Sequence, residues 1–193
     1  WKSIYREIDQ MVADGLPVSA QVAPRPIGAI LSFASTTNPF VVAPTYRRIA
    51  AQSASVDARL EAMADPAVRS AILAEHAGFH ASEGFIALIT RGFSRMFRMT
   101  DPVDYEPHES QSIAAEAARA GVDPAAYVYD ALMEEGGRRL LYMPLINYAR
   151  GNLDDVHGMM TGNHVLYGLS DGGAHCGTIC DGSFPTTTLA LWS

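Results

Sequence analysis

The first forty residues change from a helical to an extended hydrophobic pattern. Apolar side chains recur at the three- and four-residue spacing of one helix face at Trp1, Ile4, Tyr5, Ile8 and Val12. Gly15 and Pro17 end this predicted helix. The apolar run 18–22 then predicts a buried strand that stops at Pro24. Residues 27–42 are apolar and rich in Ser, Thr and Gly, a composition that suits short strands or loop.

The middle of the chain has a mostly helical pattern. Helices are predicted at 46–64, at 66–75 with Asp65 as its N-cap, at 110–120 closed by Gly121, and at 124–134 opened by Asp123. Residues 84–99 are bulky and alternate weakly, which favours a strand or hairpin. A stretch of this length is too long for one crossover connection. We therefore expect a helical subdomain inserted at 43–137.

The C-terminal part alternates apolar strands with short helices. Strands are predicted at 139–147 and 164–169, with a helix at 153–160 between them that Asn152 caps. Ser183 is expected to cap a final helix. Buried strands that alternate with amphipathic helices indicate parallel βαβ units, and hence an α/β fold.

The division that follows has three parts. Residues 1–42 are expected to form a strand and helix segment, 43–137 the helical insertion, and 138–193 the last two strands with the loop that carries the candidate chemistry.

The composition of the chain limits the classes of molecule that it is expected to bind. The chain has 193 residues, of which 48% are hydrophobic and 18% charged, enough apolar side chains for a sizeable core. The formal charge is −7 and no Lys/Arg cluster occurs, which argues against nucleic acid or an anionic membrane. No apolar run reaches the roughly 18 residues of a membrane helix. The spacing of Cys176 and Cys180 is too wide for Cys-x-x-Cys and favours free thiols, so the cytoplasm is the expected location.

The strand at 164–169 leads into the most suggestive chemistry. Ligands of parallel α/β proteins lie at the carboxyl ends of the strands, and Asp171 follows this end directly. Gly172 and Gly173 let the backbone turn sharply beside the carboxylate, and His175 comes soon after. A carboxylate and an imidazole suit metal ligation or a general base acting on metal-bound water. Asp-Gly-Gly is also a common turn, and spacing alone slightly favours the turn.

Other strand ends carry weaker candidates. Asn147 and Tyr148 follow the strand before them and could donate hydrogen bonds to a substrate, while Arg150 could bind a carboxylate with two hydrogen bonds. The alternative for all three is that they are ordinary polar residues of a loop, with no contact to a substrate. Gln21 and Arg25 lie near the end of the first predicted strand, and their side chains could point toward the same carboxyl-end edge of the sheet.

The histidines differ in how well their positions suit chemistry. His76, His80 and His108 fall in the insertion, where a surface position or a core hydrogen bond is expected. His164 opens its strand at the amino end, away from the ligand side of a parallel sheet. His175 follows the carboxyl end.

Two stretches of the chain resemble a known family. They resemble the last-strand signature of amidohydrolases, and most closely that of the N-acyl-D-amino-acid deacylases. The first stretch is 167–175, Tyr-Gly-Leu-Ser-Asp-Gly-Gly-Ala-His, and the second is 179–186, Ile-Cys-Asp-Gly-Ser-Phe-Pro-Thr. Residues 21–26 and 145–148 extend the similarity more weakly. The resemblance implies a (β/α)8 TIM barrel, of which this chain holds about the last three strands beside its helical insertion.

The resemblance also assigns roles. It implies one or two divalent ions, usually zinc, and hydrolysis of an amide in an N-acyl amino acid or a related small molecule. Asp171 would take a proton from metal-bound water, could also ligate the metal, and would return the proton to the leaving nitrogen. In this hypothesis His175 would either support the metal ligands from behind or face the substrate. Asn147, Tyr148 and Arg150 stay weaker substrate-side candidates, on the ground of their place after a strand.

The sequence also departs from the family pattern. The His-x-His pair of the family's first strand is absent, so the remaining ligands are expected outside this fragment, and Ala23 occupies a place where deacylases commonly have a metal histidine. A cyclic-amide hydrolase of the same superfamily and a metal-free, barrel-derived binding protein therefore stay open as alternatives. The chain begins at Trp1 without an initiator Met, so we expect an internal fragment that is inactive alone and a targeting signal that is not visible here.

Overall fold

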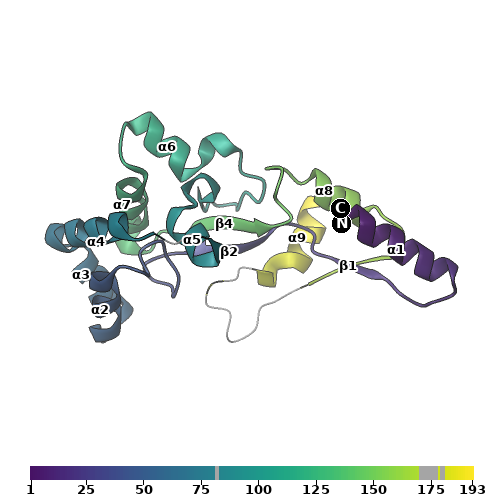
Figure 1. Cartoon of the computed structure of the whole chain (residues 1–193), viewed down its shortest axis with the longest axis horizontal. Helices are drawn as coiled ribbons and strands as arrows, with labels where there is room; N and C mark the ends of the chain where they lie inside the picture. Colours follow the sequence, from purple (N-terminus) through teal and green to yellow (C-terminus); the bar gives the residue numbers. More distant parts are fainter. Residues whose placement is uncertain (81–82, 170–177, 179–180) are drawn as a thin grey trace. The chain divides into compact units, whose positions relative to one another are not determined.

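The computed structural model describes residues 1–80, 83–169, 178 and 181–193, and these form an α/β protein (Figure 1). The chain divides into two compact units. Unit 1 joins Trp1–Gly28 to Pro144–Ser193, and unit 2 is Ala29–Met143. Among the described residues, no helix combines the length and the apolar character needed to cross a membrane.

Unit 1 is built around a pair of parallel strands. Its elements are α1 (Lys2–Ala13), β1 (Ala20–Val22), α8 (Asp154–Met160), β5 (Val165–Tyr167), the 3-10 turn η3 (Asp181–Ser183) and α9 (Phe184–Leu191). Ala20 lies opposite Val165 and Val22 opposite Tyr167. The N–H of Gly168 extends the pairing by donating to the carbonyl of Val22 at 3.0 Å. The carboxyl ends of β1 and β5 therefore lie side by side, as the sequence predicted for strands of one parallel sheet.

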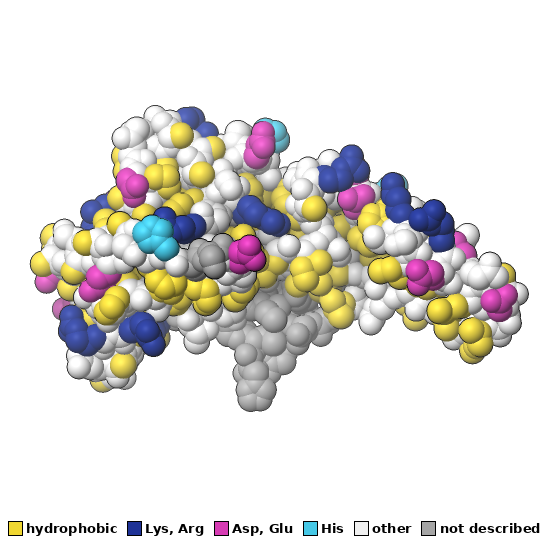
Figure 2. Space-filling model, viewed as in Figure 1, with side chains coloured by type: hydrophobic (Ala, Val, Ile, Leu, Met, Phe, Trp, Pro, Cys, Tyr) yellow, Lys and Arg dark blue, Asp and Glu magenta, His cyan; other side chains and the backbone are white. Residues whose placement is uncertain are grey.

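The hydrophobic core of unit 1 lies between these strands and α8. Its buried members are Val22, Tyr148, Leu153, Val156, Met159 and Met160. Tyr5 of α1 packs against this cluster, and its hydroxyl donates to the carbonyl of Met159 at 2.7 Å. Acidic, basic and hydrophobic side chains are mixed along α1 in Figure 2. Among the hydrophobic residues of the helix, Ile4 and Met11 are exposed. The helix at the N-terminus thus forms as its periodicity predicts but buries none of its residues fully.

Three predictions for unit 1 need correction. β5 was expected to be buried, yet Leu166 is 63% and Tyr167 56% exposed, because among the described residues its sheet has two strands and leaves part of its surface uncovered. Leu153, not Asn152, occupies the N-cap position of α8. Ser183 occupies the N-cap position of α9 but does not cap it with its side chain, because its backbone has the turn conformation of η3 (φ −91°, ψ 5°) and not the extended one of a capping residue. Its hydroxyl accepts a hydrogen bond from Arg25.

Unit 2 is mostly helical, with a small sheet. It contains most of β2 (Ile27–Leu31) and the first half of β4 (Leu141–Ile146). Its other elements are α2 (Pro44–Gln52), α3 (Val56–Met63), α4 (Pro66–Gly78), α5 (Gly84–Arg91), η1 (Phe93–Arg95), β3 (Phe97–Arg98), η2 (Glu109–Gln111), α6 (Ile113–Ala120) and α7 (Pro124–Gly137). The strand order is β2-β4-β3, and β3 runs antiparallel to β4 with Phe97 opposite Tyr142. β2 lies in the stretch that the sequence left open between short strands and loop, and it is the neighbour of β4, the strand predicted after the helical stretch.

Helix ends in unit 2 follow local capping chemistry. The Asp65 carboxylate accepts a hydrogen bond from the N–H of Ala67 at 2.7 Å, and Asp123 accepts from Ala125 at 2.9 Å. Each cap precedes a proline whose ring suits the first turn of a helix. Gly121 ends α6 with a φ of +66°, a left-handed conformation that glycine adopts without strain. The predicted starts of α4 and α7 and the end of α6 are confirmed.

The structure overturns the strand predicted at 84–99. Most of this stretch is helical, as α5 and η1, and its strand is limited to Phe97 and Arg98. Phe85, Ile89 and Phe93 recur every fourth residue, which is one helical turn and not an alternation. The helix predicted at 46–64 is also divided in two, because Ser53 is extended with a ψ of 128°.

Sheet membership differs from the expected βαβ order. β4 pairs with β2 and β3, whereas β5 pairs with β1 in a separate sheet. The alternation of strands and helices predicts which segments are extended, but it does not define which strands pair. The α/β class is confirmed. The described strands form one sheet of two and one of three, so a barrel remains a prediction.

Candidate functional site

The carboxyl ends of β1 and β5 are the place where the sequence predicts chemistry. Beyond β1 the chain passes through Ala23–Pro24–Arg25–Pro26, which we call the β1 turn. All four residues are buried. Beyond β5, Gly168 and Leu169 are described, while Asp171 and His175 lie outside the described residues. Along the chain, the described neighbours of residues 170–180, which we call the signature segment, are Gly168 and Leu169 before it and the residues around Ser183 after it.

Arg25 is the central residue of the β1 turn and is fully buried. Its Nη2 donates to the hydroxyl of Ser183 at 2.8 Å, and its Nη1 donates to the carbonyl of Pro26 at 3.0 Å. The guanidinium carbon also lies 4.3 Å from the centroid of the Phe184 ring. A planar guanidinium can stack on an aromatic ring and donate in its own plane at the same time, which an ammonium cannot. The charge of Arg25 is thus directed at the start of α9.

The other end of α9 is held by the neighbouring residue of the same turn. The indole N–H of Trp192 donates to the carbonyl of Pro24 at 2.6 Å. The Trp192 ring also stacks on His157 of α8, with ring centroids 5.7 Å apart and an interplanar angle of 21°. Consecutive residues of the β1 turn therefore contact the first residue of α9 and the residue directly after its end.

The weaker site candidates have different surroundings. Asn147, which follows β4, is half-buried and has a φ of +64°. Tyr148 is 6% exposed and belongs to the core cluster of unit 1. Arg150 is exposed and faces α8, with nitrogens 3.9 Å from Asp154 and 3.7 Å from Asp155. The structure therefore places Tyr148 in the hydrophobic core and Arg150 at the surface, and it does not bring the two side chains to one described site. Gln21, in β1, is exposed.

A metal site needs several His, Cys, Asp or Glu side chains close together. In the described ranges, no group of three His, Cys, Asp or Glu side chains could hold a metal ion. Ala23 is 5% exposed at the end of β1, and its methyl group offers no ligand. The described residues thus do not supply a ligand set for zinc. The predicted ligand Asp171 and both cysteines lie outside them.

Residues 168–172 also fit the pattern Gly-x-Ser-x-Gly, with Ser170 at its centre. In α/β-hydrolases this pattern marks a sharp turn that leads from a strand directly into a helix and exposes the serine. β5 precedes the pattern here, but the next helical residues that the structure describes begin at Asp181. Ser170 lies outside the described residues, and its substitution distinguishes serine chemistry from aspartate chemistry.

The histidines of the predicted insertion have the roles expected of them. His76 is 2% exposed, and its Nε2 donates to the carbonyl of Thr90 at 2.8 Å. Burial lowers the pKa of His76, an effect that nearby Arg91 increases and that the hydrogen bond to Thr90 opposes. His80 and His108 are exposed. These positions confirm a core hydrogen bond in one case and surface positions in the others.

A surface pocket of about 420 Å³ lies among α2, α3 and α4 in unit 2. Its charged lining residues are Arg48, Glu61 and Asp65. The Asp65 carboxylate already caps α4. The pocket therefore has charges of both signs, one of which serves the fold.

No protein-family model, no curated protein and no solved structure matches this chain. The sequence indicated that Arg25 lies at the carboxyl end of the first strand. It did not indicate Ser183 as the partner of Arg25, because 158 positions separate the two residues.

Proposed function

We propose that this chain is part of an amidohydrolase-type hydrolase that acts on carbon–nitrogen bonds other than peptide bonds. The proposed substrate is an N-acyl amino acid or a related small amide. One observation carries the proposal: the signature at 167–175 follows the carboxyl end of β5, a strand paired in parallel with β1. Ligands of parallel α/β proteins collect at this end of the strands.

The proposed reaction gives Asp171 the proton transfers. The oxygen of a water molecule attacks the amide carbonyl carbon while Asp171 accepts a proton from that water. The C–N bond then breaks, and the proton moves from Asp171 to the leaving nitrogen, giving a carboxylic acid and an amine. Near neutral pH the acid then passes its remaining proton to the amine, so the products are a carboxylate and an ammonium ion. His175, Asn147 and Arg150 are proposed to contact the substrate. Tyr148, whose ring lies in the core, is proposed to fix the strand end from behind. The family that the signature resembles uses zinc, but the described residues hold no ligand set, so no step is routed through a metal.

The test is turnover of amides by the intact protein. N-acyl derivatives of D- and L-amino acids and a set of cyclic amides are assayed with the wild type and with Asp171→Asn. Loss of a general base typically lowers the rate about 10²- to 10⁴-fold, and we expect a loss in kcat/KM of this size with an unchanged circular dichroism spectrum. Asp9→Asn, at an exposed position of α1, is the matched control and should keep wild-type activity. Near-normal turnover by Asp171→Asn contradicts the proposal.

The same experiment separates the alternatives. A preference for cyclic amides indicates a cyclic-amide hydrolase. Absence of both hydrolysis and bound zinc in the intact protein indicates a binding protein. Complete loss of activity in Ser170→Ala, together with labelling of wild-type Ser170 by a fluorophosphonate, indicates a serine nucleophile.

A further inference from the structure

The β1 turn connects three parts of unit 1 that are far apart in the sequence. Arg25 contacts Ser183 and Phe184 at the start of α9, and Pro24 contacts Trp192 at its end. Just before this turn, the carbonyl of Val22 accepts a hydrogen bond from Gly168. The end of β1 therefore holds residues on both sides of the signature segment.

The contact made by Arg25 has a defined direction. A neutral apolar side chain could fill the same space beside Phe184, and a fully buried guanidinium is costly to desolvate unless its hydrogen bonds are well formed. The guanidinium instead lies over the ring, with its carbon 4.3 Å from the ring centroid, and donates to the Ser183 hydroxyl at 2.8 Å. The ring limits where the guanidinium can lie, and the hydrogen bond sets the position of Ser183 relative to it. The pair fixes the place at which the chain enters α9.

We infer that Arg25 is a positioning residue of the proposed site, which holds Ser183 and Phe184 at the end of β1 and thereby fixes the end of the signature segment. This inference rests on the proposed function, because Asp171 belongs to the same segment. Arg25 itself does not touch the substrate, since its guanidinium is buried against α9. Arg25 affects turnover indirectly, because it holds Ser183 and Phe184 in place.

The experiment uses the intact protein and two variants of graded severity. Ser183→Ala removes one acceptor and leaves the guanidinium and its aromatic neighbour in place. Arg25→Lys keeps the charge but loses the planar fork. Thr188→Ala is the matched control, because its hydroxyl donates to the carbonyl of Phe184 within α9. Hydrogen exchange of the α9 amides and the separate values of kcat and KM are measured for each protein.

Both variants are expected to loosen α9 and to slow turnover. Exchange of the α9 amides should become faster in Ser183→Ala and faster still in Arg25→Lys, while Thr188→Ala exchanges as the wild type does. A misplacement of about 1 Å near a reacting group can lower the rate about 100-fold, so we expect kcat to fall about 10- to 100-fold in Arg25→Lys with KM changed less than about twofold. A residue that only stabilises the fold would change the fraction of active protein without this graded order.

Two results overturn the inference. One is wild-type exchange of α9 in both variants, and the other is faster exchange of α9 with an unchanged kcat. A wild-type protein that hydrolyses none of the amides overturns the proposed function instead, and the catalytic role of Arg25 with it. Exchange of α9 then still decides whether Arg25 anchors the helix, so the two failures are distinguishable.

Discussion

Glu75 of α4 binds Thr45 of α2 with both of its carboxylate oxygens. Oε2 accepts the backbone N–H of Thr45 at 2.8 Å, and Oε1 accepts its hydroxyl proton at 2.7 Å. The N-cap residue of α2 is Ala43, which has no side chain able to accept from the helix. Glu75 therefore supplies from a neighbouring helix the capping group that α2 lacks, and its negative charge lies at the positive end of the α2 dipole.

Replacing Glu75 should destabilise unit 2. We expect Glu75→Ala to lower the free energy of unfolding by about 1–3 kcal/mol, because a helix cap and two hydrogen bonds to a charged group are lost. Glu75→Gln should lose less, since its amide oxygen can still accept one hydrogen bond. Urea denaturation measures both changes. Glu61→Ala, at an exposed position of α3, is the control and should change stability by less than about 0.5 kcal/mol. Equal effects at Glu61 and Glu75 would contradict the capping role.

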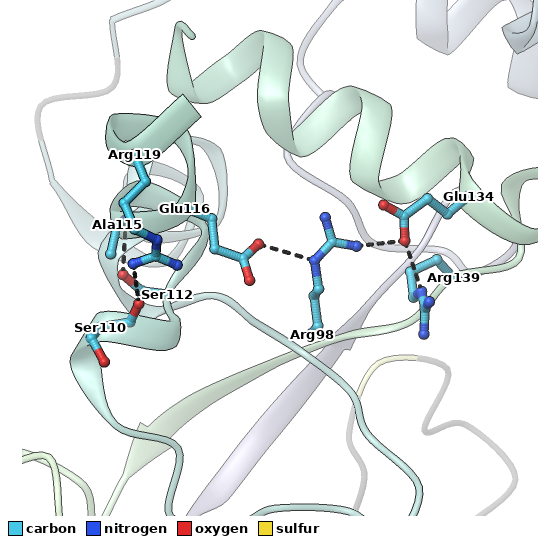
Figure 3. A network of polar contacts seen from close by, with 8 residues as sticks. All are labelled: Arg98, Ser110, Ser112, Ala115, Glu116, Arg119, Glu134 and Arg139. Carbon is cyan, nitrogen blue, oxygen red and sulfur yellow. Dashed lines mark hydrogen bonds and ion pairs between the residues drawn. The ribbon is translucent and has the colours of Figure 1, made fainter. Parts of the chain in front are cut away.

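A network of ion pairs connects four segments of unit 2 (Figure 3). Arg98 of β3 donates to Glu116 of α6 at 3.0 Å and to Glu134 near the end of α7. Arg139, just before β4, donates to the same carboxylate oxygen of Glu134 at 3.2 Å. Burial alone would lower the pKa of Arg98, but its hydrogen bonds to Glu134, Tyr127 and Glu116 outweigh burial and raise the pKa. Arg98 thus stays charged, and it bridges elements that are distant in sequence.

Removing the centre of this network should cost more than removing a surface ion pair. The Arg98 side chain is 25% exposed, whereas the side chains of the Arg138–Asp57 pair are 57% and 79% exposed. We expect Arg98→Met to lose about 1–3 kcal/mol, because it leaves Glu116 half-buried without its cation. Arg138→Met should change stability by less than about 1 kcal/mol. Urea unfolding at low and at 0.5 M salt checks both, and a larger loss at Arg138 would refute this ranking.

Local chemistry explains which parts of the fold were predictable from the sequence. The starts of α4 and α7 follow from an aspartate before a proline, since the cap and the proline ring act within one helical turn. The end of α6 follows in the same way from Gly121. Residues 84–99 were misassigned because a four-residue recurrence of bulky side chains looks similar to alternation when neighbouring positions are also apolar.

The candidate site was less predictable, because its contacts join distant positions. The pairing of Arg25 with Ser183 spans 158 positions, and no local pattern near either residue indicates it. Tyr148 looked like a polar residue after a strand, yet packing against α8 places it in the core. The role of Asp171 stays a prediction from the signature, since this residue lies outside the described ranges.

The buried imidazole of His76 should make unit 2 less stable in mild acid. Burial lowers the pKa of His76 below its unfolded value of about 6.5, so the unfolded chain binds a proton that the folded protein does not. This contribution to stability is complete above about pH 6.5 and declines as the pH falls toward the folded pKa. The added slope is at most about 1.4 kcal/mol per pH unit for one proton. Urea unfolding between pH 7.5 and 5.5 measures it.

Two variants assign this slope to His76. His76→Gln keeps a donor for the Thr90 carbonyl but cannot take up a proton, so its stability should depend less on pH than that of the wild type. Arg91 and Asp123 also act on the imidazole and are left unchanged. His80→Gln alters an exposed histidine and should keep the wild-type slope. A slope that is the same in His76→Gln and in the wild type would exclude His76 as its source.

Gly92, between α5 and η1, should tolerate no side chain. A Cβ atom at this position would lie 2.4 Å from the carbonyl oxygen of Leu88 and 2.8 Å from the Cε of Met143. The Met143 side chain can move, but the Leu88 oxygen already accepts the N–H of Gly92 at 2.8 Å and belongs to the backbone of α5. We expect Gly92→Ala to lose about 1–3 kcal/mol through overpacking, measured by urea unfolding. Gly78→Ala, at the end of α4 with no heavy atom within 4 Å, should instead be neutral or gain up to about 1 kcal/mol, and equal stability of the two variants would show that α5 can shift away from the added methyl group.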